Sequence, residues 1–332
     1  MTSEPVRWGV LGTARIGVEK VIPAMRPSTA SRVVAIASRS PAQAEAAASS
    51  LGIPAAHGSY QALLDDPEVE AVYVPLPNHL HPEWTMAAAA AGKHVLCEKP
   101  LAITSADAAA MVEACAAAEV KLMEALMYRL HPLWVQVGEM MAGGLVGELL
   151  AVQSFFSYRN VDAGNIRNIA EYGGGALLDI GCYPVNLARM LFGAEPTEVK
   201  AAIRHDPDFG TDVVTSAILD FDGRHATFTC STQIEPSQRV ELVGTTGRLV
   251  VEIPYNIPPD IPTRILHIAG GDPPVSPAIV VHEIEVADQY RIQADAFSRA
   301  IRDGTPVPTA PEDAVANLRV IERILADAAG ER

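Results

Sequence analysis

The sequence predicts an α/β protein in two parts: a doubly wound parallel sheet with helices on both faces, then an α+β region with a large, mainly antiparallel open sheet. In the first part, short runs of almost wholly apolar residues alternate with helical patterns, as strands buried on both faces do. In the second part, strand-like runs follow one another without helices between them, which indicates antiparallel pairing. The length of 332 residues suits two domains of ordinary size.

The first part alternates between strands and helices. Apolar residues recur at helical spacing after the first strand, Pro41 marks the start of a second helix, and Gly92 marks the end of a third. We place this domain at residues 1–124 and the second domain at residues 125–332. The expected strands are residues 7–11, 32–38, 71–74, 94–97 and 121–123, and the expected helices are residues 16–25, 41–51, 79–91 and 105–119.

The second domain begins with an alternating strand and a helix that ends at Gly193, and then contains a series of strands. One face of the resulting sheet is not obviously covered by helices, so we expect a homodimer or a dimer of dimers. Residues 254–277 are rich in proline and are expected to be irregular. The expected strands are residues 149–158, 197–205, 213–221, 226–232, 240–243 and 248–253, and the expected helices are residues 176–192, 288–302 and 311–328.

The composition excludes several classes of protein. Apolar residues make up 49% of the chain, which is enough for a full core and argues against disorder. With 25 Lys and Arg against 40 Asp and Glu, the net charge of −15 argues against nucleic acid and anionic membranes as partners. No apolar run approaches the roughly 20 residues of a membrane helix, and the start does not read as a signal peptide. The four widely spaced cysteines indicate a reducing compartment, and we expect a cytoplasmic protein.

A glycine-rich turn follows the first expected strand and leads into a helix. It reads Gly12-Thr13-Ala14-Arg15-Ile16-Gly17, the dinucleotide fingerprint with alanine at its second glycine. Such a turn brings backbone amides at a helix N-terminus close to a pyrophosphate. A plain strand-to-helix turn, which also uses glycine, is the alternative.

The residues after the second expected strand favour one form of the cofactor. An NAD site usually has an acidic residue there, but this chain has Ser38-Arg39-Ser40. A guanidinium beside hydroxyls suits a 2′-phosphate, so we expect NADP(H). The alternative is a solvated arginine on a loop.

A lysine lies at the carboxyl edge of the expected parallel sheet, where ligands bind in such folds. It belongs to Glu98-Lys99-Pro100, which follows the strand at 94–97. A cis Lys–Pro bond at this point would fix the direction of the lysine. A surface lysine at a strand end is the alternative.

A second group of polar residues lies on the expected helix at 176–192. Asp179 and Tyr183 are four residues apart and therefore on one face, and Pro184 predicts a kink beside the tyrosine. A carboxylate and a phenol on one face suit proton transfer, for which the tyrosine needs a nearby cation. Lys99 is the candidate cation if the two domains close together, and a packing hydrogen bond between tyrosine and aspartate is the alternative.

Together, these motifs resemble the Gfo/Idh/MocA family, which includes glucose–fructose oxidoreductase and inositol dehydrogenase. The resemblance covers essentially the whole chain and rests on the Gly12–Gly17 turn and on residues 74–81, 92–100 and 174–184. It implies an N-terminal Rossmann domain and a C-terminal α/β domain whose open sheet often serves dimerisation. Tyr183, where many members have histidine, resembles the branch of NADP-dependent xylose dehydrogenases, dimeric dihydrodiol dehydrogenases and some nucleotide-sugar ketoreductases.

The resemblance also implies a reaction and a set of residues for it. The reaction is hydride transfer at a secondary alcohol or lactol carbon of a sugar or cyclic diol. Lys99 and Tyr183 would be catalytic, with Tyr183 moving the proton, and Asp179 would orient the substrate. Pro77, Asn78 and His81 would line the nicotinamide side, Glu98 would lie near the nicotinamide ribose, and Tyr128, Tyr158, Asn165 and Arg167 would surround the substrate.

Three other interpretations remain at this stage. A ketoreductase of a nucleotide-linked deoxysugar would use the same residues with a larger, more basic cleft, which the segment 254–277 and Arg264 could shape. A non-catalytic dinucleotide-binding sensor would not need the proton-transfer residues. A metal site is weakly suggested by His79 and His81, but no third ligand is apparent, so we expect none.

Overall fold

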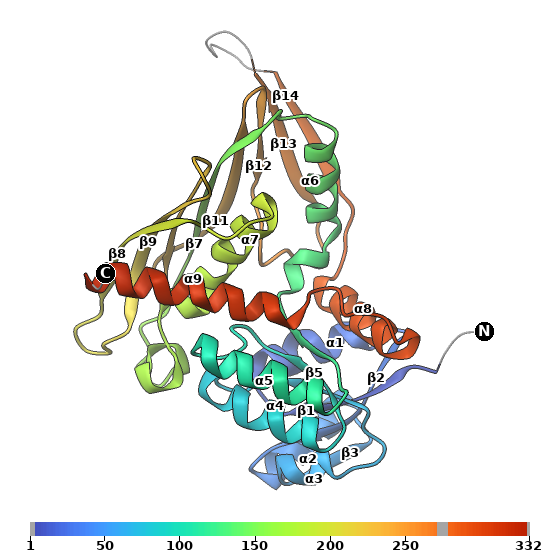
Figure 1. Cartoon of the computed structure of the whole chain (residues 1–332). Coiled ribbons are helices and arrows are strands. Elements are labelled where there is room, and N and C mark those ends of the chain that lie inside the picture. Colours follow the sequence, from blue (N-terminus) through green and yellow to red (C-terminus); the bar gives the residue numbers. More distant parts are fainter. Residues whose placement is uncertain (1–3, 271–277, 331–332) are drawn as a thin grey trace. The chain divides into compact units, whose positions relative to one another are not determined.

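The computed structural model describes residues 4–270 and 278–330, which form two compact units (Figure 1). The first unit extends to Met127 and resumes at Tyr290–Val315. The second unit comprises Tyr128–Gln289 and the chain from Ala316 onward. A helix close to the C-terminus therefore belongs to the N-terminal unit, whereas the sequence-based boundary assigns everything after residue 124 to the second domain.

The first unit contains a six-stranded, all-parallel sheet with the order β3-β2-β1-β4-β5-β6. Strands are added on one side of β1 as far as β3 and then on its other side, so the topology reverses between β1 and β4. The expectation of a doubly wound sheet is confirmed, and its ligand-binding edge is at the carboxyl ends of β1 and β4. The strands are β1 (Val6–Leu11), β2 (Ser31–Ala37), β3 (Ala55–His57), β4 (Ala71–Val74), β5 (His94–Cys97) and β6 (Leu122–Glu124).

The helices of this unit mostly match the sequence patterns. Two short elements, the strand β3 and the helix α3, were not expected. The first helix begins with a π-helical turn, η1, which lies just before Pro23. Proline has no N–H for the usual helical hydrogen bond, so a change of helical pattern next to it is expected. The helical segments are η1 (Gly17–Val21), α1 (Ile22–Met25), α2 (Pro41–Leu51), α3 (Tyr60–Leu64), η2 (Asn78–Leu80), α4 (His81–Ala90), α5 (Ser105–Ala117) and α8 (Gln289–Asp303).

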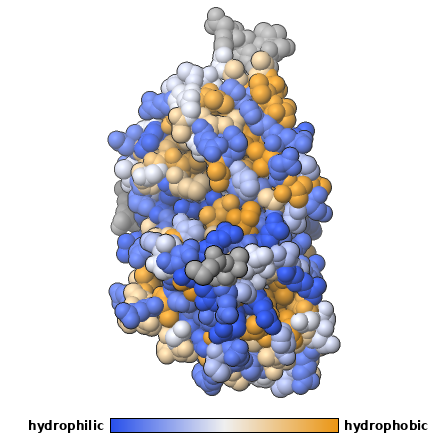
Figure 2. Space-filling view, turned by 90° about the vertical axis from the view of Figure 1, so that its right-hand side faces the viewer, coloured by the Kyte–Doolittle hydropathy of each residue, from blue (hydrophilic) through white to orange (hydrophobic). Residues whose placement is uncertain are grey.

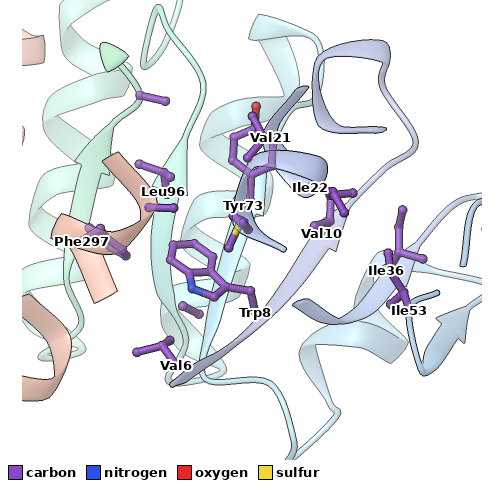
Figure 3. Close-up of a cluster of buried hydrophobic side chains, with 14 of the residues drawn as sticks. Val6, Trp8, Val10, Val21, Ile22, Ile36, Ile53, Tyr73, Leu96 and Phe297 are labelled. Carbon is purple, nitrogen blue, oxygen red and sulfur yellow. The ribbon is translucent and has the colours of Figure 1, made fainter. Parts of the chain in front are cut away.

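The core of the first unit explains why α8 belongs to it. Trp8 of β1 is fully buried and lies 5.6 Å, between ring centroids, from Phe297 of α8 (Figure 3). The indole Nε1 of Trp8 donates a hydrogen bond of 3.1 Å to the hydroxyl of Ser298. Burying a side chain such as Phe297 contributes about 1.5–3 kcal/mol, so this contact is a substantial part of the docking of α8.

The second unit contains an eight-stranded sheet with the order β14-β13-β12-β11-β7-β10-β9-β8. All neighbouring strands are antiparallel except β7 and β10, so the expected mainly antiparallel sheet is confirmed. The strands are β7 (Leu149–Arg159), β8 (Glu198–His205), β9 (Asp212–Asp220), β10 (His225–Ser231), β11 (Gln233–Gly244), β12 (Gly247–Val251), β13 (Thr263–Ala269) and β14 (Ile279–Ile284).

The expectation of an irregular segment at 254–277 is wrong for part of its length. Thr263–Ala269 forms β13, which pairs antiparallel with β12, and the following strand β14 was also missed. Pro262 lies directly before β13 rather than inside it, so the prolines flank this strand without removing its hydrogen bonds. The part of the segment at 271–277 lies outside the described residues.

Helices of the second unit pack against one face of its sheet. Tyr183 of α7 contacts Phe156 of β7, and Trp134 of α6, a helix that the sequence patterns did not predict, belongs to the same aromatic cluster. Because side chains alternate along a strand, Gln153 and Phe155 lie on the opposite face. The helical segments are η3 (Met127–Leu130), α6 (Pro132–Ala142), η4 (Ile166–Asn168), η5 (Ala170–Tyr172), η6 (Leu177–Gly181), α7 (Cys182–Phe192) and α9 (Pro311–Ala329).

Two findings concern membrane-spanning helices and disulfide bonds. No helix among the described residues has the length and apolar character needed to cross a membrane. All four cysteines are buried and free of disulfide bonds.

Candidate active site

The glycine turn after β1 has the geometry that its sequence predicts. Gly12 has a φ of +106°, a conformation that favours glycine, and a Cβ added to it would lie 3.1 Å from Leu76. Gly17 packs close to β4, since a Cβ there would be 3.6 Å from Pro75 and 3.7 Å from Tyr73. The turn therefore leaves backbone uncovered at the carboxyl end of β1 and holds the first helix close to the sheet.

A cavity of about 540 Å³ opens at this turn. Its lining includes the glycine turn, two serine residues and an arginine. Ser38 donates a hydrogen bond of 3.4 Å to Gln43 and accepts one of 3.2 Å from the amide of Ser40. The lining residues are Gly12, Thr13, Ala14, Ser38, Arg39, Ser40, Gln43, Tyr60, Pro75, Leu76 and Pro77.

The residues of this cavity fit a dinucleotide with a 2′-phosphate. A Cβ at Gly12 would fill the space beside Leu76, and Arg39 supplies the cation that a phosphate requires. Sequence reasoning missed Gln43 and Tyr60. Gln43 is three residues after the capping position Ser40 and lies in the first turn of α2. Its place at the start of an expected helix, beside Ser38 and Arg39, could have identified it from the sequence. Tyr60 gives no such signal, because only the fold brings it to the turn.

Two residues of the glycine turn lie outside the cavity lining. Arg15 forms an exposed ion pair of 2.7 Å with Glu19 on the first helix. Ile16 packs against the apolar core of the first unit. Their expected contacts with a cofactor stay a prediction.

The side chain of His81 lies inside the first unit, and its expected place beside the nicotinamide stays a prediction. Its side chain is fully buried, and its two ring nitrogens lie 3.0 Å from the carbonyl oxygen of Pro100 and 2.7 Å from that of Leu76. Burial lowers the pKa of His81, while the two carbonyl groups oppose that shift.

Lys99 lies two residues after the end of β5, within a turn that is held on both sides. The Lys99–Pro100 peptide is cis. Before it, the buried hydroxyl of Tyr73 donates a hydrogen bond of 2.6 Å to a carboxylate oxygen of Glu98. Burial, together with the Glu98 carboxylate, raises the pKa of Tyr73, so this phenol stays protonated as the donor.

In the second unit, the three glycines before α7 permit close approaches of other groups. A Cβ at Gly174 would lie 2.6 Å from the carbonyl oxygen of Arg167, and one at Gly175 would lie 2.0 Å from a carboxylate oxygen of Asp212. The Asp212 carboxylate accepts hydrogen bonds from the amide of Leu177, at 2.7 Å, and from the hydroxyl of Thr215, at 2.8 Å. A buried carboxylate thus holds the beginning of the helical segment that carries the candidate catalytic residues.

The helix changes its hydrogen-bond pattern where a kink was expected. The π-helical turn η6 covers Asp179, and α7 starts at Cys182, two residues before Pro184. As at Pro23, the missing N–H of the proline accounts for a change of pattern. Asn317 of α9 donates a hydrogen bond of 3.1 Å to the carbonyl oxygen of Cys182.

Asp179, Tyr158 and Arg167 form one cluster. The Tyr158 hydroxyl donates to a carboxylate oxygen of Asp179 at 2.5 Å, and Nε of Arg167 donates to the same oxygen at 3.0 Å. Burial and the carboxylate raise the pKa of Tyr158, and the carboxylate raises the pKa of Arg167. Asn165 caps the turn before Arg167 by accepting a hydrogen bond of 3.1 Å from its amide. Four of the residues expected around the substrate are thus brought together.

Tyr183 is surrounded by aromatic rings, and Tyr128 is one of them. The ring centroids of Tyr128, Phe156 and Tyr255 lie 5.8, 5.6 and 5.3 Å from that of Tyr183. Tyr128 is fully buried, and its hydroxyl donates a hydrogen bond of 2.7 Å to Asn186. Tyr128 therefore packs against the ring of Tyr183, and its expected contact with the substrate stays a prediction.

Two family models match the chain on either side of residue 130. The model described as the oxidoreductase family with an NAD-binding Rossmann fold matches residues 6–126, and the GFO/IDH/MocA C-terminal domain matches residues 134–250. The chain belongs to the Gfo/Idh/MocA family. The resemblance recognised from the motifs is therefore confirmed.

Relatives within the Gfo/Idh/MocA family match nearly the full chain. An uncharacterized oxidoreductase of Rhizobium meliloti is 45% identical over 96% of both chains. The D-xylose 1-dehydrogenase (NADP(+)) 2 of Haloferax volcanii is 40% identical over 96% of this chain and 95% of its own length. A solved 3-ketoreductase from Actinomadura kijaniata, in complex with NADP and TDP-benzene, has a TM-score of 0.90 at 32% identity, covering 99% of this chain and 98% of that one.

Candidate metal ligands were searched for among the residues that the structure describes. No group of three His, Cys, Asp or Glu side chains within residues 4–270 and 278–330 is arranged to hold one. Both ring nitrogens of His81 face carbonyl oxygens, so its pairing with His79 has no geometric support.

Proposed function

We propose that this protein is an NADP(H)-dependent oxidoreductase that transfers hydride between the nicotinamide and a hydroxyl or carbonyl carbon of a sugar or cyclic diol. The observation that carries the proposal is the cavity after β1, whose lining combines the glycine turn with Ser38 and Arg39. The names of the relatives support the reaction class, since they describe an NADP(+)-dependent D-xylose 1-dehydrogenase and a 3-ketoreductase.

The cofactor would be held by the first unit. The backbone of Gly12, Thr13 and Ala14 would approach the pyrophosphate, since no large side chain covers it. Arg39 and Ser38 would bind the 2′-phosphate through charge-assisted hydrogen bonds. Pro77 would lie toward the nicotinamide half, with Asn78 and Glu98 as further contacts.

The proposed chemistry assigns separate roles to Lys99 and Tyr183. The bound nicotinamide supplies the hydride chemistry. In the oxidation direction, Tyr183 Oη accepts the proton of the reacting hydroxyl as the hydride leaves the same carbon. Lys99 stabilises the ionised phenol and donates a hydrogen bond to the substrate oxygen while charge develops there. In the reduction direction, Tyr183 returns the proton.

Asp179 would orient the substrate together with its two neighbours. Its carboxylate already accepts hydrogen bonds from Tyr158 and Arg167. These bonds compensate its charge and fix its direction, so that a substrate hydroxyl meets a rigid acceptor. Asn165 contributes by capping the turn that carries Arg167.

A free aldose or cyclic diol is preferred over a nucleotide-linked deoxysugar as the substrate. The 3-ketoreductase relatives favour the second candidate. Arg264, however, forms an ion pair of 2.7 Å with Glu252, so the guanidinium that suggested a basic cleft is already paired. A non-catalytic sensor is disfavoured, because such a protein has no need of Lys99 and Tyr183.

We also propose a homodimer, or a dimer of dimers, formed by the outer face of the eight-stranded sheet. That face has a hollow of about 570 Å³ lined by Phe155, Ile218 and Arg239 among others, and Ile218 is 49% exposed. Further apolar surface lies at the β14 end of the sheet, where Ile279, Val280 and Val281 are exposed and Figure 2 shows apolar atoms near the top of the view. Burying such a face against a second copy would remove apolar surface from water.

For the location we propose the cytoplasm, where four free cysteines stay reduced.

A substrate panel tests the reaction. Purified protein is assayed by nicotinamide absorbance with NADP⁺ against aldoses and cyclic diols, and with NADPH against keto sugars, including a nucleotide-linked one. We expect turnover with a free sugar or diol and a strong preference for NADP(H). Tight NADP(H) binding without turnover on any substrate would favour the sensor, and turnover on the nucleotide-linked sugar alone would favour the second candidate.

A further inference from the structure

The turn that carries Lys99 is held by three buried side chains from three different elements of the first unit. Tyr73 of β4 donates to Glu98 at 2.6 Å, and His81 of α4 lies 3.0 Å from the carbonyl oxygen of Pro100. A carboxylate oxygen of Glu124, at the end of β6, accepts a hydrogen bond of 2.7 Å from the amide of Leu101. The three side chains are 1%, 0% and 4% exposed, so water does not compete for these bonds.

Of the three, His81 has a second partner in the wall of the cofactor cavity. Its Nε2 atom lies 2.7 Å from the carbonyl oxygen of Leu76, and Leu76 lines the cavity together with Pro75 and Pro77. A single imidazole ring therefore connects the cavity wall to the residue that follows Lys99. The connection is short and fully enclosed, and it runs through hydrogen bonds rather than through a flexible loop.

The two bonds of His81 depend on each other. Each partner is a carbonyl oxygen, which accepts hydrogen bonds and cannot donate them. A neutral imidazole has one N–H, so it donates to Leu76 or to Pro100 but not to both, whereas the doubly protonated ring donates to both. In the neutral form, a displacement of Leu76 changes which of the two carbonyl oxygens receives the single N–H, and in the doubly protonated form it shifts the ring that also donates to Pro100.

We propose that His81 and Glu124 are positioning residues for Lys99, and that His81 couples occupancy of the cofactor cavity to the placement of this lysine. A dinucleotide that packs against residues 75–77 would fix Leu76, and through His81 it would fix the turn at Pro100. Glu124 holds the other side of the same turn through Leu101. The role given to Lys99 rests on the proposed function.

Two substitutions of His81 separate its two bonds. In His81→Asn the amide nitrogen takes the place of Nδ1 and retains the bond to Pro100, whereas in His81→Gln it takes the place of Nε2 and retains the bond to Leu76. For the other side of the turn, Glu124→Gln keeps an acceptor for the amide of Leu101, and Glu124→Leu removes it. His94→Asn is the control, because His94 lies at the opposite end of β5 from Lys99 and accepts a hydrogen bond from the amide of Lys121.

The kinetic expectation is a fall in kcat with little change in cofactor affinity. We expect His81→Gln and Glu124→Leu to lower kcat about 10- to 100-fold, the scale of a small misplacement of a catalytic group. The Kd for NADP⁺ should stay within about threefold, and Glu124→Gln and His94→Asn should keep kcat within about threefold of wild type.

In a Lys99→Met background, neither His81→Gln nor Glu124→Leu should lower kcat further, because the group that they position is gone. Additive losses in that background would overturn the positioning role.

A second readout needs no turnover. Hydrogen exchange of the peptide covering residues 98–101 reports local opening of the turn. We expect NADP⁺ to slow this exchange in wild type and in His94→Asn, and to have no effect on it in either His81 variant. Unchanged exchange in wild type with NADP⁺ bound would overturn the coupling without recourse to any variant. If wild type turns over no substrate but NADP⁺ still slows the exchange, the coupling stands and the proposed reaction fails.

Discussion

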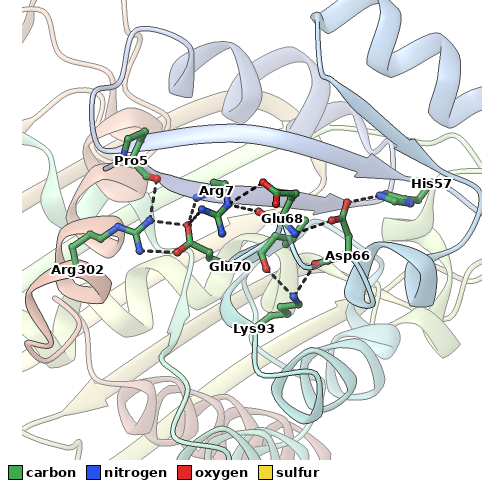
Figure 4. Close-up of polar contacts among 9 residues, drawn as sticks. Pro5, Arg7, His57, Asp66, Glu68, Glu70, Lys93 and Arg302 are labelled. Atoms are coloured by element: carbon green, nitrogen blue, oxygen red, sulfur yellow. Dashed lines mark hydrogen bonds and ion pairs between the residues drawn. The ribbon is translucent and has the colours of Figure 1, made fainter. Parts of the chain in front are cut away.

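Arg302 forms a two-pronged ion pair with Glu70, with distances of 2.8 Å from Nη1 to Oε1 and 2.7 Å from Nη2 to Oε2 (Figure 4). The same guanidinium donates to the carbonyl oxygens of Glu4 and Pro5. The amide of Arg7 donates a hydrogen bond of 2.9 Å to Glu70. Arg302 therefore connects α8 to the residues just before β1 and to the residue before β4. Both of these segments of the first unit are more than 200 residues away from Arg302 in the sequence.

This ion pair makes stability depend on pH. The pKa of Glu70 is lowered from 4.5 to about 2, chiefly by the hydrogen bonds from Arg302. A carboxyl whose folded pKa lies below its unfolded value stabilises the fold above the unfolded pKa, and this contribution is lost as the pH falls toward about 2. We expect Arg302→Met to cost about 1–3 kcal/mol at neutral pH, since the pair is partly exposed, and the difference from wild type to shrink between about pH 5 and pH 2.

Urea unfolding of both proteins at several pH values measures that difference. Arg299→Gln is a matched control on the same helix, because Arg299 makes a more exposed contact of 3.9 Å with Asp295. It should cost less than about 0.5 kcal/mol at any pH. A constant difference between wild type and Arg302→Met down to pH 2 would contradict the assignment of the pH effect to Glu70.

Cofactor choice is expected to depend on Arg39. Its guanidinium lies beside Ser38 and Ser40 in the cavity, where the 2′-phosphate would bind. Arg39→Ala should weaken NADP(H) binding by about 1.5–3 kcal/mol, or roughly 10- to 100-fold in Kd, and leave NAD(H) almost unchanged. Fluorescence titration of both cofactors measures the effect, with Arg32→Ala at the opposite end of β2 as the control. Equal affinity of the wild type for both cofactors would argue against the 2′-phosphate site.

Tyr183 is expected to carry the proton. Tyr183→Phe removes the hydroxyl and keeps the ring among Tyr128, Phe156 and Tyr255, so the melting temperature and NADP(H) binding should change little. Turnover should fall by about 10²- to 10⁴-fold, the usual contribution of a general acid–base group. Steady-state kinetics on the best substrate of the panel is the measurement. Near-normal turnover would make Tyr183 a packing residue.

The helix that carries Asp179 and Tyr183 should be very sensitive at Gly175. This residue has a φ of +118°, and an added Cβ would lie 2.0 Å from a carboxylate oxygen of Asp212. Gly175→Ala should therefore destabilise the protein by at least about 3 kcal/mol through strain and displacement of the buried carboxylate. Gly193→Ala is the control, because Gly193 has a φ of +61° with nothing within 4 Å of the added Cβ. Its cost should be about 1 kcal/mol, and equal costs in urea unfolding would refute the role of Asp212.

The assembly is expected to depend on the outer face of the eight-stranded sheet. A charge introduced by Ile218→Glu lies within the hollow on that face and should split the dimer into monomers. Val161→Glu is the control, because Val161 is 53% exposed but lies outside the strands of the sheet. Light scattering at micromolar concentration gives the mass of each protein. A monomeric wild type would refute the proposal.

Local sequence determined the type of most elements and several of their ends. The expected strands at 71–74 and 94–97 coincide with β4 and β5, because a strand buried on both faces requires a continuous apolar run. The glycine turn, the Lys99 motif and the Asp179–Tyr183 pair were also recognisable, because each needs particular residue types at fixed spacing. Backbone geometry imposes these patterns within a few residues, so they can be read without knowing the fold.

The tertiary structure alone decided which surface each of these elements meets. The docking of α8 on β1 rests on the hydrogen bond between Trp8 and Ser298, residues 290 positions apart. The enclosure of His81 and of Tyr128 likewise depends on distant carbonyl groups and rings. Such contacts leave no local periodicity, because the free energy of burial depends on how much surface is covered and not on where its neighbours lie in the sequence.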